Sequence, residues 1–221
     1  MRKLVAGLAC LVCISLLAGC NREEHSWSSV LRPAEITELG IDLSGITLSE
    51  DGAEFFNKIT DGLKSDTEDT EQFDIAVQET QLFAADGGYF VAEGYRIAGA
   101  VDTQWYEISY LSGGDVRTLF SGEKTGTTLF TAESDTLYLL WQDGVLSALN
   151  STDDLKELYD FREENDAEVY MGIDSTMTGN GSKLKISAVF RRSGDNTQSR
   201  TDSLTYDIDS GHTEYARGTF Q

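Results

Sequence analysis

The chain has 221 residues and a formal net charge of -21, from 17 basic against 38 acidic residues, and 40% of its residues are hydrophobic. This composition indicates a folded protein, and the length suffices for one domain with a core. So acidic a surface repels phosphate backbones, which excludes nucleic acid as a partner and disfavours docking on anionic lipid by charge. Twenty-one glycines and a single proline predict many glycine turns.

The N-terminal segment has the features of a signal peptide. Arg2 and Lys3 precede an apolar run from Leu4 to Leu17, and small residues then come before a cysteine. The run is shorter than the roughly 20 apolar residues of a membrane-spanning helix. An ordinary secretory signal that is cut elsewhere is the alternative interpretation.

The end of this segment, Leu17-Ala18-Gly19-Cys20, resembles the lipobox of bacterial lipoproteins. The resemblance implies that Leu17, Ala18 and Gly19 are recognised for cleavage and that Cys20 receives the lipid, such as palmitate. The chain would then be anchored to a membrane on its extracytoplasmic face, at the cell surface or in the periplasm. Asn21 is not the aspartate that favours inner-membrane retention in such proteins, so either membrane stays open.

All three cysteines, Cys10, Cys13 and Cys20, lie in this signal. Only the lipid-bearing cysteine would remain after cleavage, so no disulfide is expected in the mature chain. Thiolate zinc sites and cysteine nucleophiles are excluded for the same reason. Loss of Arg2 and Lys3 leaves 15 basic against 38 acidic residues, a net charge of -23.

Four regions are expected: a signal peptide over 1–20, a polar tether over 21–47, a short helix with an acidic loop over 48–72, and a β-repeat domain over 73–221. Ser49 is placed to cap the helix, with Glu50 and Asp51 in its first turn and Gly62 at its end. The alternative is a turn at 51–52 that leads into a strand. The acidic run after the helix lacks the glycine-turned calcium loop and is interpreted as solvated.

From Phe73 onward, β-branched and aromatic residues alternate with polar ones, which indicates strands. Residues 82–91 resemble residues 129–140 and, more weakly, 179–189. A hairpin follows each copy, with turns expected at 112–115, 150–154 and 209–211. Tyr89 and Tyr138 are 49 residues apart, close to the repeat length of about 40 to 50 residues in propeller blades.

The repeats therefore resemble β-propeller blades. We predict a mainly β fold, made of antiparallel sheets of propeller-blade-like repeats in a small or incomplete propeller, with a short N-terminal helix. Three or four units fall at or below the roughly four to eight blades of a closed ring. Either a partner or a second subunit covers the free strand edges, or the fold is a curled β-meander or sandwich.

The residues that catalysis needs are sparse. His25 lies in the tether and His212 beside a turn, and no nucleophile elbow, phosphate loop or dinucleotide fingerprint occurs. We predict that the chain is not an enzyme and uses neither a cofactor nor a metal. Glu93, Asp102 and Glu107 lie among aromatics and are the first candidates for a glycosidase pair.

Two tryptophans near turns, Trp105 and Trp141, are expected to be partly exposed and are the candidate ligand contacts. The segment from Arg191 to Arg200 is the only basic cluster after the signal, and is interpreted as a long polar hairpin loop or a contact patch. We predict a lipid-anchored, extracytoplasmic binding or assembly module of the bacterial envelope. Its partner would be an envelope protein or a glycan, with a homo-oligomer also open. The alternative is a carbohydrate-binding or carbohydrate-active lipoprotein.

Overall fold

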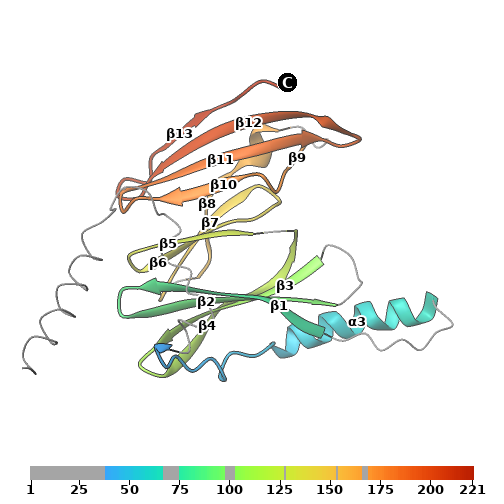
Figure 1. The fold of residues 1–221 in the computed structure, drawn as a ribbon, viewed down its shortest axis with the longest axis vertical. Helices are drawn as coiled ribbons and strands as arrows, with labels where there is room; N and C mark the ends of the chain where they lie inside the picture. The colour runs from blue at the N-terminus through green and yellow to red at the C-terminus, as the bar shows by residue number, and fades with distance from the viewer. Residues whose placement is uncertain (1–37, 67–74, 98–102, 127, 153, 166–168) are drawn as a thin grey trace, which may run out of the picture.

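A computed structural model describes residues 38–66, 75–97, 103–126, 128–152, 154–165 and 169–221. In this part of the chain one α-helix precedes a series of antiparallel strands, so the predicted mainly β fold with an N-terminal helix is confirmed. The strands form three sheets that stack one upon another (Figure 1). Each sheet is built from one continuous stretch of sequence, with its four main strands side by side in chain order.

Each predicted repeat corresponds to one sheet. Sheet A comprises β1 (Ile75–Ala85), β2 (Gly88–Ile97), β3 (Thr103–Ser112) and β4 (Asp115–Thr125). Sheet B comprises β5 (Leu129–Glu133), β6 (Thr136–Leu140), β7 (Val145–Asn150) and β8 (Lys156–Asp160). Sheet C comprises β10 (Thr176–Gly179), β11 (Lys183–Arg192), β12 (Asp195–Asp207) and β13 (Thr213–Ala216), with β9 (Val169–Met171) also paired to β11. A short 3-10 helix, η1 (Phe161–Glu164), joins sheets B and C.

Two hairpin turns lie where glycines predicted them. The β3–β4 turn is Gly113–Gly114, as predicted for 112–115, and β12 and β13 are joined around residues 208–212. The long polar loop predicted for 191–200 is wrong. Strands β11 and β12 continue to Arg192 and from Asp195, with a tight turn at Ser193 and Gly194 between them, because each strand extends the other's hydrogen-bonded ladder.

Sheet B forms the middle layer and is buried on both faces. Leu137 and Leu139 of β6 pack into a cluster with sheet A, whereas Tyr138 and Leu140 pack into a cluster with sheet C. Alternate residues of one strand thus supply two separate cores. This arrangement explains why β6 is buried almost throughout its length.

The N-terminal part of the described chain covers the outer face of sheet A. The helix α3 (Glu50–Asp66) begins after Ser49, whose side-chain oxygen accepts a hydrogen bond from the Gly52 amide at 3.2 Å, so the predicted cap is confirmed. The helix continues past Gly62, where its end was predicted. Residues 40–47, assigned to the tether, lie against sheet A, and Ile46 is buried there.

The three sheets form an open stack among the described residues, without closing into a ring. Their first strands, β1, β5 and β10, are neighbours along one side of the stack. Hydrogen bonds join the hairpin turns there, from the Asp86 amide to the Ser134 carbonyl and from the Gly181 amide to the Glu133 carboxylate, both at 2.9 Å. On this side of the stack, hydrogen bonds between turns therefore hold neighbouring sheets together.

Candidate functional site

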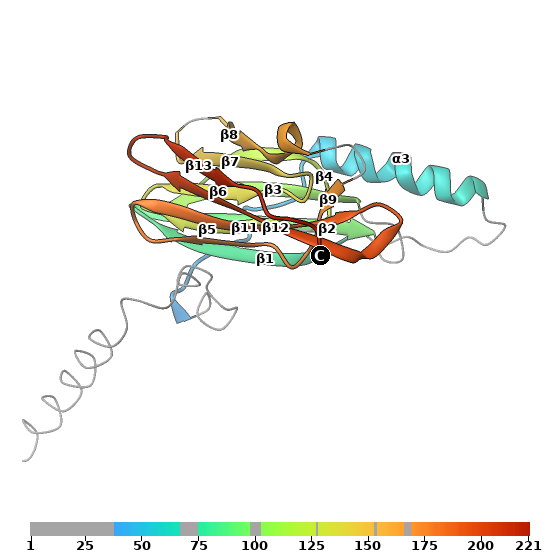
Figure 2. The same ribbon diagram turned by 90° about the horizontal axis from the view of Figure 1, so that it is seen from above.

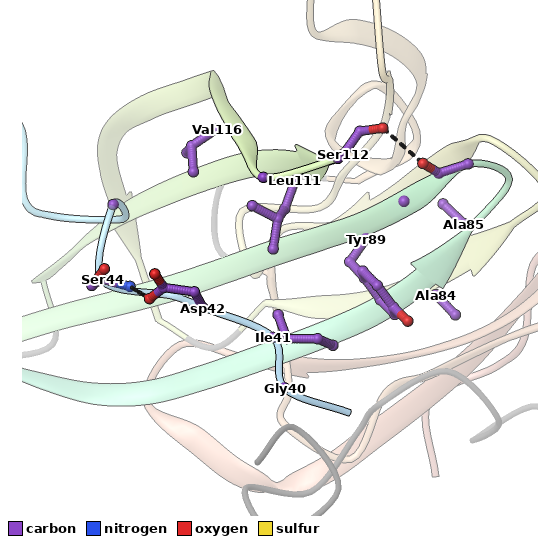
Figure 3. Close-up of a pocket in the computed structure, with 15 residues that line it drawn as sticks. Gly40, Ile41, Asp42, Ser44, Ala84, Ala85, Tyr89, Leu111, Ser112 and Val116 are labelled. Carbon is purple, nitrogen blue, oxygen red and sulfur yellow. Dashed lines mark hydrogen bonds between the residues drawn. The ribbon is translucent and has the colours of Figure 1, made fainter. Parts of the chain in front are cut away.

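A cavity of about 660 Å³ lies on the outer face of sheet A (Figure 3). One wall is the segment from Gly40 to Gly45, which crosses the sheet before α3 begins. The opposite walls are the β1–β2 turn at 87–88 and the β3–β4 turn at 113–114. The cavity is therefore built between the domain and the stretch of chain that leads into it.

The glycine pair of the β3–β4 turn keeps one side of this cavity open. Gly113 and Gly114 have φ angles of 60° and 92°, which is the left-handed geometry of a two-residue hairpin turn that other residues rarely adopt. A β-carbon at either position would meet no atom within 4 Å. The backbone of this turn thus stays accessible to a bound group.

Asp42 is the carboxylate among the residues that line the cavity. It accepts a hydrogen bond from the Ser44 amide at 2.9 Å (Figure 3). Hydrogen bonds from the Ser44 backbone and side chain lower the pKa of the Asp42 carboxyl, so the group is ionised at neutral pH. The cavity therefore presents a fixed negative charge at its rim.

Hydrogen bonds between sheet A's two turns hold the far wall in place. The Ser112 hydroxyl donates to the Gly87 carbonyl at 2.8 Å (Figure 3), and the Tyr110 hydroxyl donates to the Asp86 carbonyl at 2.9 Å. Apolar side chains also line the cavity, and of these Leu111 is buried and Val116 exposed: Ile41, Ala84, Ala85, Tyr89, Leu111 and Val116. This mixture of a charge, hydroxyls and small apolar groups suits binding, and its lining pairs no nucleophile with a base.

The predicted carboxylate pair comes together, but beneath the helix. Glu93 and Glu107 lie directly opposite each other on β2 and β3 and are 7% and 2% exposed. The Glu107 Oε1 atom accepts hydrogen bonds from the amide and the hydroxyl of Ser49, at 3.0 and 2.6 Å, from the Trp105 indole at 2.7 Å and from the Ser121 hydroxyl at 3.0 Å. Glu107 thus anchors the start of α3 to the sheet.

The Glu93 carboxylate accepts a hydrogen bond from the Tyr95 hydroxyl at 2.5 Å. Burial raises the pKa of the Glu93 carboxyl, and the charge of Glu107 adds to this rise against the opposing effect of the Tyr95 hydrogen bond. A glycosidase pair has to face a cleft that a sugar can enter. This pair faces the helix instead, and the third candidate, Asp102, lies outside the described residues.

The prediction that Trp105 and Trp141 are partly exposed is wrong. Trp105 is 9% exposed because Phe55 of α3 packs on it, with ring centroids 5.1 Å apart. Trp141 is 1% exposed, with Phe120 packed on one side and the Lys124 ammonium 4.5 Å from the ring centroid. Both rings are covered by residues distant in sequence, so neither offers an open stacking surface.

The lipobox residues Leu17, Ala18, Gly19 and Cys20 lie outside the described residues. His212 is exposed beside the β12–β13 turn. The basic cluster divides: Arg191 pairs with Asp174, whereas Arg192 and Arg200 lie at a second cavity. The cavity on sheet A was not predicted, although its double glycines at 87–88 and 113–114 were visible in the sequence.

The described residues contain no group of three or more His, Cys, Asp or Glu side chains placed to hold a metal ion. No helix in the described ranges has the length and apolar character of a membrane span. No family model, curated protein or solved structure matches the chain.

Proposed function

We propose that this chain is a lipid-anchored binding module of the bacterial envelope, which holds a segment of an envelope protein in the cavity on sheet A. The lipid would be attached at Cys20, because the preceding residues resemble a lipobox. The observation that carries the binding role is the cavity itself. It is open and held by hydrogen bonds, and it lacks a catalytic pair among its lining residues.

The lining indicates the chemistry of the bound segment. Asp42 would accept hydrogen bonds from an amine or hydroxyl, and Ile41, Leu111 and Val116 would contact a small apolar side chain. The open backbone of Gly113 and Gly114 can exchange hydrogen bonds with an extended peptide. The partner proposed is therefore a protein segment with a basic residue beside an apolar one.

The finer fold class belongs to the same proposal. Three consecutive meander sheets with neighbouring first strands support propeller-blade-like repeats in an incomplete propeller. A curled β-meander remains the alternative, since a stack of three sheets satisfies both descriptions. In either arrangement the cavity on sheet A lies at one end of the stack.

Site-specific photo-crosslinking in intact cells tests the binding role. A photoreactive residue at Val116, in the cavity, should crosslink one envelope protein stoichiometrically. The same residue at Thr118, exposed on the same strand but outside the cavity lining, is the matched control and should not. Filling the cavity with Val116→Trp should abolish a crosslink made from Ser44, whereas Thr118→Trp should leave it.

The Cys20→Ala chain tests the anchor separately. It should lose membrane association and, with it, the crosslink. Equal crosslinking from Val116 and Thr118 contradicts the site, and membrane association of Cys20→Ala contradicts the anchor.

One observation favours glycan binding as a second candidate. Trp141 lies at a smaller cavity of about 260 Å³ together with Asp143, Glu157 and Arg162, and its indole N–H has no hydrogen-bond partner within the described residues. Lys124 would have to move from the ring to admit a sugar. Under this alternative, Lys124→Ala should strengthen the quenching of tryptophan fluorescence by N-acetylglucosamine oligosaccharides, and unchanged quenching would dismiss it.

A further inference from the structure

A second cavity, of about 430 Å³, lies at the C-terminal end of sheet C and is lined by three arginines. Arg192 comes from the end of β11, Arg200 from β12, and Arg217 from the segment after β13. The ring of Phe220 contacts Arg192 and Arg200, and Val169, Gly218 and Thr219 complete the lining. The chain carries a net charge of -21, so three converging guanidinium groups are an exception on this protein.

A buried ion pair holds the floor of this cavity. Arg200 donates to both oxygens of Asp202, from Nε at 2.8 Å and from Nη2 at 2.9 Å, and the two side chains are 2% and 0% exposed. Asp202 also accepts from the Tyr215 hydroxyl at 2.5 Å and from the Gly218 amide at 2.9 Å. The pair therefore fixes the segment that carries Arg217 onto β12, and Asp202 neutralises Arg200.

Close packing fixes the same segment further. A β-carbon on Gly218 would lie 2.2 Å from the Thr201 carbonyl oxygen, so this position accepts glycine alone without a backbone shift. Ser199 and Gln221 exchange two backbone hydrogen bonds, at 3.2 and 3.0 Å. The end of the chain thus runs beside β12 (Figure 1), and its geometry is set before any ligand arrives.

Phe220 orients two of the arginines, Arg192 and Arg200. The guanidinium carbon of Arg192 is 4.6 Å from the ring centroid, and that of Arg200 is 5.0 Å from it. Stacking on an aromatic face leaves the edge of a guanidinium, with its N–H groups, free to point at an acceptor. Arg192 is exposed, so its donors are available at the cavity.

Two positive charges at the cavity lack a carboxylate partner. Within the described residues neither Arg192 nor Arg217 forms an ion pair, whereas the adjacent Arg191 pairs with Asp174. Retaining two unpaired cations beside a preformed cavity gives an anion both charge and directed donors. A tetrahedral oxyanion offers enough acceptors for two guanidinium groups at once, which a single carboxylate does less well.

We propose that this cavity binds a phosphate group, with Arg192 and Arg217 as the contacting cations and Arg200 as the buried residue that positions Phe220 and the C-terminal segment. The inference is independent of the proposed function, since it uses neither the lipid anchor nor the cavity on sheet A. The phosphate could be free or part of a lipid headgroup. Both sources present the same oxyanion.

Calorimetric titration of the Cys20→Ala full-length chain with inorganic phosphate, at constant ionic strength set by chloride, tests the site. Arg192→Gln and Arg217→Gln should each weaken binding about tenfold, the effect of losing one charge-assisted contact. Arg191→Gln removes the same charge one residue away and should bind as the parent does. Both cavity arginines are exposed and form no ion pair in the described chain, so these variants should unfold at the parent's temperature.

Vesicle flotation with the same chain distinguishes the sources. Binding to phosphatidic acid vesicles over phosphatidylcholine vesicles, lost in Arg192→Gln, assigns a lipid headgroup and supports the proposal. Phosphate binding in the calorimeter without flotation assigns a soluble phosphate and also supports it. Absence of heat above the chloride control, or equal loss in Arg191→Gln, overturns the proposal.

Discussion

The outer faces at the two ends of the stack differ, because one is covered and the other is exposed. On sheet A the outer face carries Tyr95, Trp105 and the two buried glutamates, and α3 together with residues 41–46 covers it (Figure 1). Figure 2 shows that α3 also extends past the ends of the strands. On sheet C the outer face carries hydroxyl and charged side chains, among them Lys183, Lys185 and Ser203, and no described element covers it. The outer face of sheet A is thus covered by the N-terminal part of the described chain, whereas the outer face of sheet C is polar and exposed to solvent.

This difference shows how a stack of few sheets can stop without forming a ring. Strand β11 alternates between buried and accessible residues, as a strand with one solvated face should, whereas β2 is buried over most of its length. A polar outer face is the usual end of a repeat array. Closure by a second subunit is therefore not required by the geometry of either end.

Removing Glu107 should have the largest effect on this comparison. Glu107→Ala leaves the hydroxyl and amide of Ser49 and the Trp105 indole without their acceptor in a buried place. We expect the free energy of unfolding to fall by about 3 kcal/mol, because buried donors that lose a charged partner are costly. Urea unfolding followed by tryptophan fluorescence measures the loss.

The matched control is Glu214→Ala, the same chemical change on the exposed face of β13. It should alter the free energy of unfolding by less than about 0.5 kcal/mol. If both variants lose equally, Glu107 does not anchor the helix, and the contrast between the two faces fails.

The cap of α3 should have an intermediate effect. Ser49→Ala removes the hydrogen bond to the Gly52 amide and one hydrogen bond to Glu107. We expect a loss of about 1.5 kcal/mol, at the upper part of the range for helix caps. Hydrogen exchange should quicken in the first turn of α3, while Ser203→Ala, at an exposed residue of β12, should leave both stability and exchange unchanged.

Much of the fold could be predicted because its contacts are local. Alternation and glycine turns identified the hairpins, and Ser49 with its acidic first turn identified the start of α3. The continuation of that helix past Gly62 could not be predicted, since a glycine costs only about 1 kcal/mol in a helix and does not by itself end one. The stacking of the sheets depends on faces that meet across long sequence distances.

The candidate site was harder to predict than the fold, because it is also formed by residues that are distant in sequence. The cavity on sheet A brings residues 40–45 to two turns that follow some forty and seventy residues later. Phe55 covers Trp105, and Lys124 covers Trp141. In both cases the covering residue is distant in sequence from the tryptophan. The alternation of apolar and polar residues predicts a strand and its two faces. It does not predict which distant element covers one of those faces.

The buried Glu93 carboxyl should also make the covered end of sheet A sensitive to pH. Because the pKa of Glu93 is raised in the folded chain, the folded state holds its proton more tightly than the unfolded state. The free energy of unfolding of the parent, relative to Glu93→Gln, should therefore fall as the pH rises from about 4.5 through the raised pKa of Glu93. Thermal unfolding of both chains between pH 4 and 8 measures this difference, and a constant difference would contradict it.

The smallest effect on the free energy of unfolding is expected for a substitution on the exposed outer face of sheet C. Ser203 is an exposed residue of β12, so Ser203→Lys adds a charge to a surface already in water. The free energy of unfolding should change by less than about 0.5 kcal/mol, and light scattering should give the mass of one chain before and after the substitution. A parent dimer that Ser203→Lys dissociates would mean that a second copy covers this face. The two ends would then differ only in whether the cover comes from the same chain, and polarity would not be what ends the stack.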